Sequence, residues 1–68
     1  MKLYMVRKAP RPKAWQVIAA HRARAIESKS FANDAELEQA YNRATTVTLS
    51  SRRAAVAFVE RIGGVVVE

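Results

Sequence analysis

Hydrophobic and polar residues alternate at the start of the chain. Residues 2–8 are rich in strand-forming residues, and a strand would place Leu3 and Met5 on one face and Tyr4 and Val6 on the other. Two prolines follow shortly afterwards, and a proline cannot donate a backbone hydrogen bond to a neighbouring strand. The pattern therefore predicts a strand that ends in a proline-containing turn.

Residues 13–28 fit two interpretations. Five alanines together with Gln, Arg and Glu favour a helix, whose apolar stripe would carry Trp15 and Ile18 but would be interrupted by Arg22. A strand would instead place Arg22 and Arg24 together on one face. Composition favours the helix slightly, and the sequence leaves both interpretations open.

A helix and then a strand are predicted over residues 33–49. Asn33 and Glu36 have the spacing of a capping box, with Asn in the cap position. From Leu37 onward, apolar residues recur at the i, i+3, i+4 and i+7 positions of a helical face. The segment 45–49 alternates and is rich in β-branched residues, which favours a strand.

The same order, helix then strand, is predicted again at the end of the chain. Ser50 or Ser51 is suited to cap a second helix, and Gly63–Gly64 is suited to end it because glycine readily adopts left-handed backbone conformations. Residues 65–67 are valines and predict a last short strand. We expect a single α+β domain over residues 1–68, with a small mixed sheet of about three strands and two or three helices packed on one face.

Charge is distributed unevenly along this pattern. The 68 residues include 12 Lys and Arg against 6 Asp and Glu, a formal net charge of +6. Residues 1–29 hold eight basic residues and one acidic residue, which gives a formal charge of +7. Residues 30–68 hold four basic residues and five acidic residues, which gives −1. A basic half of this kind indicates an acidic partner and says nothing about the fold.

The sequence carries no signature of catalysis or of cofactor binding. It has no Cys and a single histidine, His21, so it can build neither a zinc cluster nor a Cys–His pair. The glycines at 63–64 follow a predicted helix, whereas phosphate-binding loops precede one. We therefore expect no enzyme, no metal and no other cofactor.

No apolar run approaches the roughly 20 residues of a membrane-spanning helix, and we expect a soluble cytoplasmic protein that does not bind membranes.

Basic residues gather in a first candidate site near the N-terminus. Two prolines hold a segment with four cations semi-extended, so that it could follow a phosphate backbone, and two later arginines would extend the surface. The residues of this site are Arg7, Lys8, Arg11, Lys13, Arg22 and Arg24. Trp15 would add stacking on bases if it were exposed, and the alternative is a solvated loop beside a Trp15 that belongs to the core.

The second candidate is an anion site where a predicted strand runs into the last helix. It comprises Ser51, Arg52 and Arg53. Backbone N–H groups at a helix N-terminus favour an anion, and arginine in the first turn is unfavourable against the helix dipole unless it serves another purpose. The alternative is a solvated turn with ordinary serine capping.

These features lead to three hypotheses of function. The first is a small basic nucleic-acid-binding protein that holds DNA or RNA phosphates with its N-terminal half. The second is a small inhibitor or adaptor, of phage or mobile-element type, that binds an acidic surface of a host protein complex. The third is a self-associating subunit, such as a homodimer, paired through the 65–67 strand at a sheet edge. No zinc-finger, RNA-recognition-motif or Gly-x-x-Gly pattern is present to decide among them.

Overall fold

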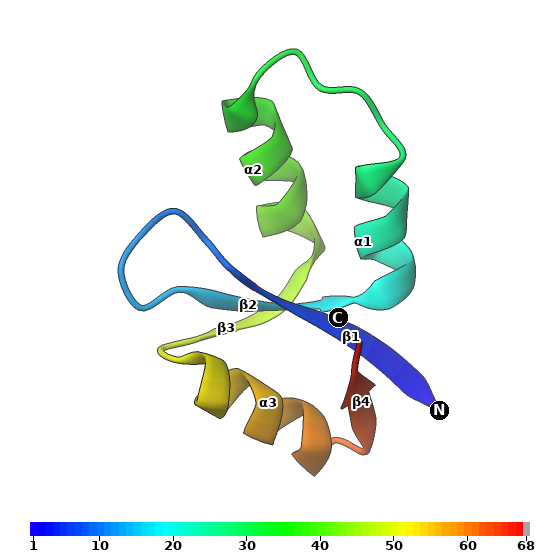
Figure 1. The fold of residues 1–68 in the computed structure, drawn as a ribbon, viewed down its shortest axis with the longest axis vertical. Coiled ribbons are helices and arrows are strands. Elements are labelled where there is room, and N and C mark those ends of the chain that lie inside the picture. Colours follow the sequence, from blue (N-terminus) through cyan, green and yellow to red (C-terminus); the bar gives the residue numbers. More distant parts are fainter. Residues whose placement is uncertain (68) are drawn as a thin grey trace.

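The structure, a computed structural model, describes residues 1–67. In chain order its elements are β1 (Lys2–Lys8), β2 (Trp15–Ala19), α1 (Ala20–Glu27), α2 (Asp34–Ala44), β3 (Thr45–Leu49), α3 (Arg52–Arg61) and β4 (Gly64–Val66) (Figure 1). The α+β class predicted from the sequence is confirmed, with four strands in the described residues where about three were expected. No helix in this part of the chain is long and apolar enough to cross a membrane.

The four strands form one mixed sheet in the order β3-β2-β1-β4. β1 and β2 form an antiparallel hairpin in which Lys8 pairs with Trp15. β2 also pairs antiparallel with β3, so that Trp15 lies opposite Leu49, and the register shifts between Val17 and Ile18. β4 pairs in parallel with β1. β3 and β4 are therefore the edge strands.

The ambiguous residues 13–28 divide between the two interpretations. β2 takes up Trp15–Ala19, and α1 begins at once at Ala20. β2 is paired on both sides and Gln16, Val17 and Ile18 are buried, so the pairing and burial available at the centre of the sheet outweigh a mild helix preference. After this strand, the alanine- and arginine-rich sequence forms the helix that its composition favours.

The helices cover both faces of the sheet (Figure 1), and the expectation that all of them pack on one face is wrong in this respect. α3 packs against one face, where Tyr4, Val17 and Val59 belong to a core cluster and are at most 9% exposed. α1 and α2 lie against the other face, on the side to which Ile18 points because side chains alternate along a strand. Both β1 and β2 carry apolar residues on both faces, so each face requires a cover.

Trp15 belongs to the core on the α3 face. Its side chain is half-buried and packs against the core cluster. The interpretation of Trp15 as a packing residue is therefore confirmed.

Candidate functional site

Two segments that are far apart in the sequence emerge at the same end of the sheet. Lys8, the last residue of β1, pairs with Trp15, and Trp15 pairs in turn with Leu49, the last residue of β3. The β1–β2 loop and the start of α3 therefore lie at the same end of the sheet, on the left in Figure 1. Because neighbouring strands lie about 4.8 Å apart, this row of paired residues spans about 10 Å from Lys8 to Leu49.

We call this basic region the hairpin end. It is defined by the side chains of Lys8, Arg11, Lys13, Arg52 and Arg53, all of which are exposed. Residues 8–14 and 48–53 contain no Asp or Glu, so five positive and no negative side chains give these two segments a formal charge of +5. Part of the first candidate site and the whole of the second thus lie at the same end of the sheet.

The β1–β2 loop is held in a defined shape by its own hydrogen bonds. The amide of Ala9 donates to the carbonyl of Ala14, and the amide of Arg11 donates to the carbonyl of Ala9, both at 2.8 Å. The ammonium of Lys8 donates to the carbonyls of Ala9 and Arg11. Lys13 has a φ of 52°, in the left-handed region that residues other than glycine rarely adopt. Arg11 and Lys13 are therefore presented by an ordered turn.

The start of α3 adds its dipole to the hairpin end. Ser51 is the N-cap, and its Oγ accepts a hydrogen bond from the amide of Ala54 at 3.0 Å. This is the ordinary capping role that the sequence offers as the alternative to an anion ligand. The first turn has no acidic residue and exposes Arg53, so the partial positive charge of the helix terminus adds to that of the arginine. Arg52 and Arg53 thus form the α3 part of the hairpin end, directly after the capping residue Ser51.

Arg7 is engaged inside the fold. Its guanidinium forms a bidentate ion pair with the carboxylate of Glu38 of α2, with Nη2–Oε2 at 2.7 Å and Nη1–Oε1 at 2.9 Å. The central carbon of the guanidinium also lies 4.1 Å from the centre of the Tyr41 ring. Nη1 also donates to Oε1 of Gln16 at 2.7 Å, and Nε2 of Gln16 donates to Oδ1 of Asn42 at 2.5 Å. The Arg7 side chain is only 19% exposed. It fastens α2 to the sheet, and this placement argues against the phosphate contact expected of it.

Arg22 and Arg24 lie away from the hairpin end. The loop precedes Trp15 and α1 follows Ala19, and the 5 residues of β2 between them span about 17 Å. Both arginines are exposed, but residues two apart on a helix point about 200° away from each other. The single basic surface predicted from the N-terminal half is therefore divided between the two ends of the sheet.

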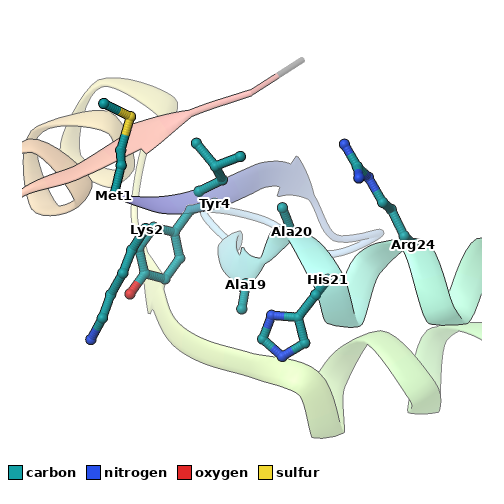
Figure 2. Close-up of a pocket in the computed structure, with 8 residues that line it drawn as sticks. Met1, Lys2, Tyr4, Ala19, Ala20, His21 and Arg24 are labelled. Atoms are coloured by element: carbon teal, nitrogen blue, oxygen red, sulfur yellow. The ribbon is translucent and has the colours of Figure 1, made fainter.

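A pocket of about 600 Å³ lies at the end opposite to the hairpin end, where β1 begins and β2 passes into α1 (Figure 2). Its lining includes Lys2, Tyr4, His21 and Arg24 and contains no acidic residue. The sequence gives no signal for this pocket, because its residues come together only through the pairing of Tyr4 with Ala19. Across the described part of the chain, no group of three or more His, Cys, Asp or Glu side chains could hold a metal ion.

Comparison with known proteins identifies no relative of this chain. No protein-family model, no curated protein and no solved structure matches it. The geometry and charge of the hairpin end are therefore the features that bear on function.

Proposed function

We propose that this protein is a small nucleic-acid-binding module without catalytic activity, which holds phosphates with the basic side chains of the hairpin end. One observation carries the proposal: the β1–β2 loop and the start of α3 lie at the same end of the sheet and together carry five exposed cations. Neither segment contributes an acidic side chain. Clusters of this kind bind phosphate backbones because each Lys or Arg that neutralises a phosphate releases a condensed counterion.

The size of the hairpin end suits a short run of phosphates. The paired row beside it extends about 10 Å, and phosphates on one strand of a duplex recur about every 3.4 Å along the axis. About three phosphates of one strand would therefore lie within reach of the loop and of the helix terminus. The exposed side chains best placed to contact them are those of Arg11, Lys13 and Arg53.

The composition of the hairpin end favours phosphate contacts and offers no side chain suited to reading adenine. Phosphate contacts position a protein on a nucleic acid without reading bases; adenine is read mainly by Asn or Gln, whereas Arg and Lys can also read guanine. Residues 8–14 and 48–53 contain neither amide residue. Base stacking is also not the main contact, because Trp15 packs against the core. We therefore expect duplex and single-stranded nucleic acids to bind through their backbones.

The proposal is tested by fluorescence anisotropy with labelled single- and double-stranded DNA and RNA that carry 5′-hydroxyl ends. The variant combines Arg11→Gln, Lys13→Gln and Arg53→Gln, which removes three positive charges from the hairpin end. Loss of these contacts should weaken binding at least about tenfold at constant salt, equivalent to about 1.4 kcal/mol. None of the three side chains makes a hydrogen bond or an ion pair with another described residue, so the variant should fold normally, as circular dichroism would confirm.

A matched control removes the same amount of charge elsewhere. It combines Lys29→Gln, Arg43→Gln and Arg61→Gln, three exposed positions outside the hairpin end. The control should bind nearly as tightly as the unmodified protein. Equal weakening in both variants would mean that net charge alone drives binding and would refute the assignment of the site. If no nucleic acid binds even at low salt, the proposed function is wrong, and an acidic protein surface becomes the partner to seek.

A further inference from the structure

The pocket opposite to the hairpin end combines polar and apolar side chains. It lies between the start of β1 and the first turn of α1, and its volume of about 600 Å³ is within the usual range for small-molecule sites. Leu3, Ala19 and Ala20 supply apolar surface to its lining. Figure 2 shows Lys2 and Tyr4 extending in the same direction on one side of Ala19, with the His21 ring on the other.

The first turn of α1 opens into this pocket without a side-chain cap. Asn33 caps α2 and Ser51 caps α3, but the N-cap of α1 is Ala19, which makes no side-chain hydrogen bond. The first turn of α1 also has no acidic residue. Ala19, Ala20 and His21 all line the pocket. The helix terminus therefore presents its partial positive charge to the pocket, where an anion would complement it.

Tyr4 supplies an independent indication of a ligand. Its side chain is about nine-tenths buried, at 9% exposure, and it lines the pocket. Its hydroxyl makes no hydrogen bond to any described residue. No fully enclosed side-chain nitrogen or oxygen in residues 1–67 lacks a hydrogen-bond partner, so the Tyr4 hydroxyl, which has none, is accessible to solvent. A ligand in the pocket would take the place of the water that otherwise bonds to this hydroxyl.

We propose that this pocket binds a phosphate monoester that carries an apolar or aromatic body. A phosphate dianion presents several acceptor oxygens in different directions, which suits donors that come from Lys2, Tyr4, His21 and the first turn of α1. The apolar lining receives the body of the ligand. A free nucleoside monophosphate and the 5′-phosphorylated end of a nucleic-acid strand share this chemistry. The site is separate from the hairpin end, and the proposal does not depend on the function proposed for that surface.

The test is a titration of the ¹⁵N-labelled protein followed by NMR, with adenosine monophosphate, adenosine and inorganic phosphate as probes. Adenosine monophosphate should bind at least about tenfold more tightly than either of the other two and should shift the amide signals of Ala20 and His21. A short DNA with a 5′-phosphate, compared with the same DNA bearing a 5′-hydroxyl, distinguishes a strand end from a free nucleotide. Binding of either phosphorylated probe through these amides supports the proposal.

Three variants tie the binding to the pocket. Tyr4→Phe removes only the hydroxyl, and Lys2→Gln removes one charge; each should weaken adenosine monophosphate binding about five- to tenfold. Because the hydroxyl has no partner in the protein, Tyr4→Phe should leave the melting temperature unchanged. Arg22→Gln is the control, since this exposed residue of α1 does not line the pocket and its loss should leave binding intact.

Three results would overturn the proposal. The first is that neither phosphorylated probe binds at millimolar concentration. The second is that adenosine binds as tightly as its monophosphate. The third is that Lys2→Gln weakens binding no more than Arg22→Gln. The triple variant at the hairpin end should keep its affinity for adenosine monophosphate, so failure of this site and failure of the hairpin end can be told apart.

Discussion

Replacing Arg7 with methionine should destabilise the fold strongly, although Arg7 lies in the most basic part of the sequence. Arg7→Met removes the guanidinium and keeps an apolar stem of similar length, so the effect reports the polar contacts. Gln16 is 1% exposed, and its Oε1 would lose the Arg7 donor that it has at 2.7 Å. A buried polar atom left without a partner costs about 1–3 kcal/mol.

The ion pair with Glu38 adds a smaller amount. The two side chains are 19% and 26% exposed, so solvent screens the pair and the Glu38 carboxylate can be rehydrated when its partner is lost. We assign this loss about 1 kcal/mol, for a total of about 2–4 kcal/mol. A domain of this size has a free energy of unfolding of roughly 3–10 kcal/mol, so a single substitution would remove a large part of it.

Urea unfolding followed by the fluorescence of Trp15 measures this effect directly, because this residue is the only tryptophan and packs against the core. Arg22→Met is the control, since Arg22 is exposed on α1 and its loss should change the free energy of unfolding by less than about 0.5 kcal/mol. If Arg7→Met lowers the free energy of unfolding no more than this control does, the contacts of Arg7 with Gln16 and Glu38 do not hold α2 against the sheet, and the reasoning is refuted. Under folding conditions, Arg7→Met should still bind nucleic acid through the hairpin end.

Two further substitutions test the packing and the capping. Gly64→Ala should cost about 1–3 kcal/mol in urea unfolding, because an added Cβ would lie 2.7 Å from Cε2 of Tyr4 and 3.0 Å from Cγ1 of Val59; unchanged stability would show that β4 is packed differently. Ser51→Ala should lower the free energy of unfolding by about 1 kcal/mol through loss of the α3 cap, whereas Ser50→Ala should have little effect; equal losses would contradict the assignment of the cap.

Local signals in the sequence predict those elements whose cause is local. Asn33 caps α2 as expected, with its Oδ1 accepting from the amide of Glu36 at 2.9 Å, and the Glu36 carboxylate accepts in turn from the amide of Ala32 at 3.2 Å. Ser51 caps α3, and Gly63 ends it with a φ of 78°. In each case the residues that interact are at most four positions apart, so the pattern contains the whole interaction.

Features that depend on distant pairing are outside the reach of such patterns. Residues 15–19 become a strand because β1 and β3 pair with both of their edges. Arg7 is not part of the basic surface because its guanidinium is paired with Glu38, which is 31 positions away in the sequence. Composition could identify a basic half, but only the register of β1, β2 and β3 decides which cations meet at one end of the sheet.

The most direct test of the central claim is the salt dependence of nucleic-acid binding by the unmodified protein and by the variant with Arg11, Lys13 and Arg53 replaced by Gln. If these side chains neutralise phosphates, the logarithm of the affinity for duplex DNA should fall linearly with the logarithm of the salt concentration. The slope should then be shallower in the variant by about 2–3, since each lost phosphate contact changes it by about 0.9. Identical slopes in the two proteins would contradict binding through the hairpin end.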